Sequence, residues 1–212
     1  MILSDADSWI NAHLLELVEA WEELGHTVHR THELADAGAG DFCFCLGFGR
    51  LLPESVRARF HHTLVVHESD LPRGKGWSPL TWQILDGADR IPVTLIEAAD
   101  KVDSGTIYAQ RWVEFEGHEL VDELRAAQGE ATRALCREFV DDYPACAERG
   151  REQHGEESFY PRRKPDDSRI DPERPLAEQL ALLRVVDNGR YPAFFEWRGR
   201  CFELHITGTR NT

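Results

Sequence analysis

Apolar residues recur at two spacings along this chain, one typical of helices and one typical of strands. Segments of the two kinds alternate, which predicts an α/β fold. Residues 8–24 place apolar side chains three or four positions apart between glutamates, which is typical of an amphipathic helix, and residues 118–143 repeat the pattern. Strands are predicted at 1–3, 26–31, 41–47, 63–66, 92–97 and 106–115, with short helices at 51–60 and 78–87, the latter capped by Ser78 ahead of Pro79. Strands that alternate with helices favour an open, mostly parallel twisted sheet flanked by helices.

The composition changes after Tyr143. Residues 144–175 are rich in charge, proline and glycine, which is typical of a long connection. Apolar residues at helical spacing follow, and the alternation on either side of Arg198-Gly199 indicates a hairpin. We therefore predict a main domain at 1–143, a charged connecting segment at 144–175 and a small helix-and-hairpin subdomain at 176–212. That last unit is too small to fold alone, so it must dock onto the main domain or onto a partner, and a homodimer is one such arrangement.

The charge balance and the chain start narrow the classes of partner. Acidic residues outnumber basic ones by 38 to 24, so the formal net charge is −14, which disfavours sequence-independent binding to nucleic acid. No apolar run approaches the roughly 20 residues that span a bilayer, and the N-terminus lacks the basic region of a signal peptide. We expect a cytoplasmic protein that does not contact a membrane.

The five cysteines do not form the paired spacings of a disulfide framework or a zinc site. Cys43 and Cys45 alternate in an apolar run, so we expect both on the buried face of a strand. His61, His62 and His67 lie close together in sequence, but alternation along a strand points them to different faces. We therefore expect no metal site.

A histidine and an aspartate stand where ligands bind in open α/β sheets. His67 follows the apolar run 63–66, and Asp103 lies in a polar loop after the run 92–97. Ligands bind beyond the carboxyl ends of the strands in such sheets, so both side chains could meet in one cleft. A His–Asp pair handles protons near neutral pH. Spacing alone leaves the alternatives of a structural histidine and an ordinary Asp-Ser-Gly turn.

The amino-acid sequence of residues 65–110, taken as a whole, resembles that of the folate-dependent formyltransferases. That family shows N-x-H-x-S-L-L-P, a glycine-containing loop, a P-x-x-W helix that ends in glycine, and later D-x-G-x-I-x-x-Q. The matching residues are His67, Ser69, Leu71, Pro72, Gly76, Pro79, Trp82, Gly87, Asp103, Gly105, Ile107 and Gln110. Residues 47–53 and 162–170 also resemble family segments. The resemblance implies a Rossmann-like formyltransferase core at 1–143.

The resemblance also implies an activity. A formyl group would pass from 10-formyltetrahydrofolate, the co-substrate, to an amine without any metal. His67 would stabilise the oxyanion, while Asp103 would orient His67 and help to take the proton that the amine loses. Backbone groups of the matching loops would contact the pterin ring, namely those of Arg50, Leu51, Leu52, Ala98, Ala99 and Asp100.

One departure from the family motif affects catalysis. Val65 occupies the position of the family's asparagine, which would donate a hydrogen bond to the formyl oxygen. Losing one such donor raises a barrier by about 2.7–4 kcal/mol. His62 and Lys75 are candidates to replace it. The alternatives are a formyltetrahydrofolate hydrolase and a catalytically impaired protein that binds folate or a nucleotide sugar.

The acceptor implied by the resemblance is a nucleotide-linked amino sugar. The amino-acid sequences of residues 67–79 and 187–197 look most like those of the sugar N-formyltransferases that act on 4-amino-4,6-dideoxy sugars for surface glycans. The short tail and the acidity argue against a tRNA substrate. Predicted substrate contacts are Ser69, Lys75, Trp77, Arg162 and Arg163; for the two arginines the alternative is a solvated loop that pairs with nearby aspartates, and for Trp77 it is a packing role.

Overall fold

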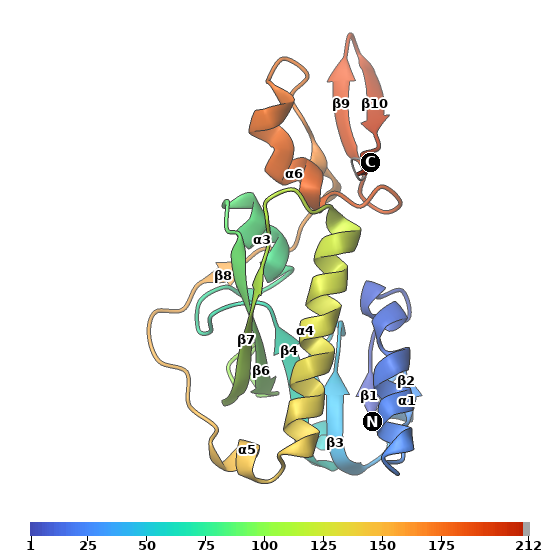
Figure 1. Ribbon diagram of the computed structural model, residues 1–212, viewed down its shortest axis with the longest axis vertical. Helices are drawn as coiled ribbons and strands as arrows, with labels where there is room; N and C mark the ends of the chain where they lie inside the picture. The colour runs from blue at the N-terminus through green and yellow to red at the C-terminus, as the bar shows by residue number, and fades with distance from the viewer. Residues whose placement is uncertain (210–212) are drawn as a thin grey trace.

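A six-stranded mixed sheet forms the centre of the computed structural model, which describes residues 1–209 (Figure 1). Its strand order is β2-β1-β3-β4-β6-β7, where the first four strands run parallel and β6 and β7 are antiparallel to their neighbours. The strands are β1 (Ile2–Leu3), β2 (Arg30–Thr31), β3 (Gly40–Cys45), β4 (Phe60–His67), β6 (Arg90–Glu97) and β7 (Ile107–Glu114). The predicted open, mostly parallel α/β sheet is confirmed.

Helices cover both faces of this sheet. The long helix α4 (Val121–Asp141) packs against β6, β7 and the short helix η1. Its buried side chains Leu135 and Phe139 share one cluster with Trp21 and Phe44. On the other face Cys43 and Cys45 are both buried, as predicted. The remaining helices of the main body are η1 (Trp9–His13), α1 (Leu15–Glu23), η2 (Leu34–Asp36), α2 (Glu54–Arg57), α3 (Pro79–Leu85) and α5 (Ala145–Glu148).

Three local predictions need correction. The helix expected at 8–24 is divided at Leu14 into η1 and α1. Ser78 does not cap α3 with its side chain, because it turns the chain in the left-handed region, with φ at 50°, directly after Trp77 bonds to Tyr160. Trp82, expected in the core, is half-buried and donates its indole N–H to the carbonyl oxygen of Pro161 at 3.0 Å.

The chain that follows α5 returns along the sheet edge. We call residues 151–163 the strap; Figure 1 shows it running beside β7 to β8 (Phe159–Tyr160). There β8 pairs in parallel with β5 (Lys75–Gly76), while Arg151 bridges to Ile107. The segment that the sequence presents as a connection therefore makes backbone contacts with the main body at two points.

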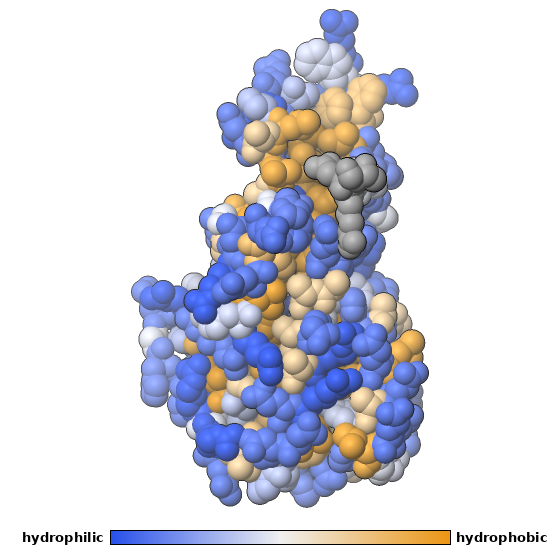
Figure 2. Space-filling view, in the orientation of Figure 1, coloured by the Kyte–Doolittle hydropathy of each residue, from blue (hydrophilic) through white to orange (hydrophobic). Residues whose placement is uncertain are grey.

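The C-terminal residues form a small unit at one end of the molecule, above α3 and α4 in Figure 1. It contains η3 (Pro165–Ser168), η4 (Leu176–Gln179), α6 (Leu180–Val185) and the hairpin β9 (Ala193–Trp197) and β10 (Arg200–Leu204). The predicted hairpin turns through Arg198 and Gly199, which both have positive φ. α6 packs on α3, and apolar side chains gather at this junction in Figure 2. Residues 210–212, the end of the predicted 176–212 unit, lie outside the described residues. Within 1–209, no helix is both long and apolar enough to cross a bilayer.

Candidate active site

The imidazole of His67 is held at the end of β4 with only 5% of the residue exposed. Its Nε2 lies 2.8 Å from the carbonyl oxygen of Gly74. A carbonyl oxygen can only accept, so this contact places a hydrogen on Nε2. The other ring nitrogen, Nδ1, lies 3.5 Å from Oδ2 of Asp103. The structure thus brings together the two residues that the sequence singled out, although they are separated by a whole helix and strand.

Asp103 is fixed by its own loop. Its backbone adopts the left-handed conformation with φ at 48°, which aspartate tolerates better than most residues. Its carboxylate Oδ2 accepts the backbone N–H of Gly76 at 2.9 Å, and its carbonyl oxygen accepts from the Gln153 side chain at 2.9 Å. At Gly105, a Cβ atom would stand 1.8 Å from the carbonyl oxygen of Glu97. Glycine at this position therefore lets the loop approach β6 closely.

The loop 74–76 contacts both members of the pair. Gly74 accepts from His67, and Gly76 donates to Asp103. Lys75, between them, is 1% exposed, and its ammonium donates to Ser104 Oγ at 2.7 Å and to Glu157 Oε1 at 2.6 Å. Lys75 therefore points into the protein toward the strap and away from the cleft, so the predicted roles in substrate binding or as the oxyanion donor do not agree with the structure.

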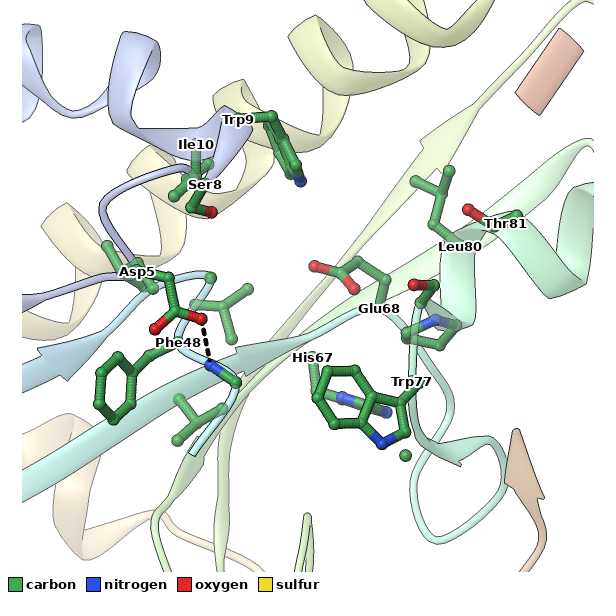
Figure 3. A pocket seen from close by; sticks show the side chains of 18 of the residues that line it. Asp5, Ser8, Trp9, Ile10, Phe48, His67, Glu68, Trp77, Leu80 and Thr81 are labelled. Atoms are coloured by element: carbon green, nitrogen blue, oxygen red, sulfur yellow. Dashed lines mark hydrogen bonds between the residues drawn. The ribbon is translucent and has the colours of Figure 1, made fainter. Parts of the chain in front are cut away.

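A cleft of about 570 Å³ opens beside His67. Figure 3 shows Asp5, Ser8, Trp9 and Ile10 along one side and Leu80 and Thr81 along the other, with His67, Glu68 and Trp77 between them. The predicted site residues that line this cleft are His67 and Asp103, with Arg50, Leu51, Leu52, Ala98, Ala99, Trp77, Arg162 and Arg163. Both loops that the family resemblance assigns to the pterin ring therefore border the same space as the His–Asp pair.

Three further candidates lie away from the cleft walls. Ser69 is 2% exposed and packs inside the loop that follows β4, where its carbonyl oxygen accepts from Thr94. Asp100 turns its carboxylate to the guanidinium of Arg57. His62 is held by Glu97, 2.8 Å from Nδ1, in an aromatic cluster beneath α4, so it cannot replace the family asparagine. Ser69 is therefore corrected from a substrate contact to a buried loop residue, and the Asp100 side chain belongs to a surface ion pair.

The two strap arginines predicted to contact substrate, Arg162 and Arg163, differ in their surroundings. Arg162 is exposed and lies with its guanidinium 4.7 Å from the centre of the Trp77 ring. Arg163 donates to the carbonyl oxygen of Asp167 at 2.8 Å, and burial lowers its pKa although the charge of Asp167 opposes that shift. Trp77 lines the cleft, as one of its two predicted roles required. Arg162 is therefore the arginine of the strap that is better placed to meet a ligand.

Several residues that line the cleft were not predicted from the sequence. Arg125 on α4 pairs with Asp187 of the C-terminal unit at 2.7 Å, and Arg190 pairs with Asp7 at 3.0 Å. Glu68 occupies the variable position directly after His67. All five line the cleft. Only the position of Glu68 within the motif offered a signal, since the ion pairs join segments that are far apart in sequence.

Within residues 1–209, no three histidine, cysteine, aspartate or glutamate side chains gather in a way that could hold a metal ion. His61 faces Asp41 at the surface, His62 faces Glu97, and His67 faces Asp103. The three histidines therefore have separate acidic partners.

Comparison with known proteins agrees with this geometry. The model of the formyl transferase family, Formyl_trans_N, matches residues 25–138. Methionyl-tRNA formyltransferase of Sorangium cellulosum is 34% identical over 113 residues, which are 51% of this chain but only 36% of that protein. The matched segment thus spans about a third of that relative.

Solved structures share the fold over nearly the whole chain. Methionyl-tRNA formyltransferase from Clostridium thermocellum superposes with a TM-score of 0.81 and 20% identity, over 99% of this chain and 92% of that one. HypX from Aquifex aeolicus in complex with tetrahydrofolic acid gives 0.79 and 19%, over 97% and 37%. A 4-N formyltransferase from Francisella tularensis gives 0.73 and 15%, over 99% and 97%. At these identities the structures establish the fold, while the family model, which covers more than half of the chain, shows that this protein belongs to the formyl transferase family.

Proposed function

We propose that this protein transfers a formyl group from 10-formyltetrahydrofolate to the amino group of a nucleotide-linked sugar of the 4-amino-4,6-dideoxy type, for surface glycan synthesis. The observation that carries the proposal is the His67–Asp103 pair, 3.5 Å apart at the floor of the cleft, in a chain of the formyl transferase family. The loops at 50–52 and 98–99 border the same cleft, where they offer backbone groups to the pterin ring.

The chemistry assigns a distinct part to each member of the pair. The amine nitrogen forms a bond to the formyl carbon, and the carbonyl oxygen becomes an oxyanion. His67, when protonated, stabilises that negative charge, and Asp103 keeps the ring in place. The bond between the formyl carbon and N10 of the folate then breaks, and the proton that the amine loses reaches N10. Two products result, the formamide and tetrahydrofolate, so atoms and charges balance.

The choice of a nucleotide sugar as the acceptor rests on charge. A net charge of −14 opposes a large polyanion such as tRNA, whereas a nucleotide sugar needs only a local cation for its diphosphate. Arg162, exposed at the cleft beside Trp77, supplies one.

One incubation tests the donor and the acceptor together. The purified protein is mixed with 10-formyltetrahydrofolate and a panel of nucleotide-linked amino sugars, and the products are read by mass spectrometry. We expect one sugar to gain the mass of CO. Initiator methionyl-tRNA, included as a separate acceptor, should remain unformylated. Formylation of that tRNA alone would overturn the sugar assignment.

A hydrolase remains the second candidate because of Val65. This side chain lines the cleft where the family has an asparagine, so the donor that favours the amine reaction is absent at this position. A hydrolase would release formate from 10-formyltetrahydrofolate in the absence of any amine. The same incubation without a sugar separates the two activities.

A further inference from the structure

Glu68 carries a carboxylate into the cleft that the proposed mechanism does not use. Figure 3 shows it directed into the space between Trp9 on one side and Leu80 on the other, next to His67 in the chain. Its carbonyl oxygen accepts from Gln83 at 2.5 Å, which fixes the backbone. Its Oε1 accepts from the side chain of Gln128 on α4, also at 2.5 Å. The carboxylate is therefore held in one orientation toward the cleft.

This half-buried carboxylate has a neutral hydrogen-bond partner, the side chain of Gln128. Burial raises the pKa of Glu68, and the nearby charge of His67 only partly offsets that shift. In residues 1–209 no basic side chain forms an ion pair with it, and the arginine on the same face of α4, Arg125, is engaged by Asp187 at 2.7 Å. A carboxylate that is partly withdrawn from water without a cation is destabilised, and a cationic ligand would relieve that cost.

The acceptor of formyl transfer is such a cation before it reacts. A primary amine on a sugar carries a proton near neutral pH, and it must lose that proton before its lone pair can attack. We propose that Glu68 binds the ammonium group of the acceptor beside His67 and receives its proton. This inference rests on the proposed function and adds to it the residue that selects an amine and activates it.

The proton passes from the ammonium group to the Glu68 carboxylate without any further reactant. One N–H bond of the ammonium breaks and an O–H bond of the Glu68 carboxyl forms, which leaves a neutral amine next to a neutral acid. The amine then attacks the formyl carbon as described above. A carboxyl group whose pKa lies above its ordinary value is the stronger base, so burial of Glu68 favours this transfer.

The charged groups around Glu68 set the pH range of this step. His67 precedes it on β4, Asp103 faces His67 from the loop after β6, and Arg125 lines the same cleft from α4, where the neutral Gln128 is its hydrogen-bond partner. Asp187 from the C-terminal unit neutralises Arg125. Binding of the ammonium requires the ionised carboxylate, so affinity for the amine should rise with pH until the amine itself loses its proton.

The test compares two ligands that differ only in the reacting group. UDP-4-amino-4,6-dideoxyglucose and UDP-6-deoxyglucose, which carries a hydroxyl at the same carbon, are titrated calorimetrically into the wild-type protein and into Glu68→Gln. The glutamine keeps the shape and an oxygen for Gln128 but loses the charge. Asp70→Asn is the matched control, because it removes an exposed carboxylate two residues away that contacts Gln110 outside the cleft.

We expect the wild type to prefer the amine by about tenfold or more, as for a hydrogen-bonded charge. Glu68→Gln should bind both ligands about equally and lose about 100-fold or more in kcat/KM for transfer. Asp70→Asn should behave like the wild type. If Glu68→Gln retains the preference while the wild type formylates the amino sugar, the inference is wrong and the proposed function stands. If the wild type binds neither ligand, both are wrong for this sugar.

Discussion

The ammonium of Lys75 lies 2.6 Å from the carboxylate of Glu157, so the strap is joined to the loop that contacts both His67 and Asp103. Lys75 is 1% exposed, whereas the Glu157 side chain remains 54% exposed. The Lys75 ammonium holds the pKa of Glu157 below its usual range. Lys75 points away from the cleft, and it anchors the loop 74–76, which contacts both members of the pair.

Replacement of Lys75 by methionine should therefore lower kcat far more than it raises KM. The loop 74–76 would lose its contacts with Ser104 and Glu157, and small displacements of catalytic groups cost about 100-fold. Steady-state kinetics of formyl transfer measure this split. Arg111→Met, which removes an exposed pair with Glu138 outside the cleft, is the control. A Lys75→Met protein with unchanged kcat would contradict the positioning role.

His67→Ala and Asp103→Asn should each abolish transfer while the fold remains intact. Asp103→Asn keeps an oxygen for the backbone N–H of Gly76 but removes the charge that faces Nδ1 of His67. Loss of a proton-handling group costs about 10²–10⁴-fold in rate. Rates come from the mass-spectrometric assay and folding from circular dichroism. A near-normal rate in either variant would refute the proposed mechanism.

Val65→Asn should accelerate transfer. The Val65 side chain lines the cleft two residues before His67, and its backbone is already paired with Cys45 and Ile96. An asparagine there would offer an N–H to the oxyanion, and one such donor is worth about 10²–10³ in kcat. Single-turnover rates of the two proteins provide the comparison. An unchanged rate would show that another group already serves the oxyanion.

Glu68→Gln should raise thermal stability at neutral and alkaline pH. Burial raises the pKa of Glu68 in the folded state, so the folded protein holds this proton more tightly than the unfolded chain does. Stability then falls as pH rises from the ordinary glutamate pKa through the raised value, and the loss is complete above it. Melting curves should show a higher Tm for the variant at pH 8, with the difference vanishing at acidic pH where both states are protonated. A lower Tm at pH 8 would contradict the burial cost.

The elements with local signals were predictable from sequence. The apolar repeat at 118–143 corresponds to α4 at Val121–Asp141, and the alternation around Arg198-Gly199 corresponds to the hairpin. Such patterns arise because one face of the helix or strand is buried, and they can be recognised from residues that are close together in the sequence. The positions of His67 and Asp103 after apolar strands left a structural histidine and an ordinary turn as alternatives, and the family resemblance of residues 65–110 singled the pair out.

The direction of individual side chains in the loops was not predictable. Lys75 looked like a ligand contact, yet Glu157 and Ser104, distant in sequence, draw its ammonium inward. Ser69 matches the family motif but is buried within its loop. The two-residue strands β5 and β8 are too short to produce a pattern, and their pairing joins segments more than 80 residues apart. Tertiary contacts of this kind leave no periodicity in the sequence.

The position of the strap has a consequence for the order in which the protein matures. During synthesis the six strands of the central sheet emerge first, and α4 can cover them before the strap has left the ribosome. The loop beside His67 and Asp103 acquires its final contacts only when the strap is available. These contacts are the ion pair of Lys75 with Glu157 and the strand pairing of Gly76 with Tyr160. A nascent chain can thus hold a folded sheet while the loop beside His67 and Asp103 still lacks its contacts with the strap, so we expect activity to appear later in translation than structure.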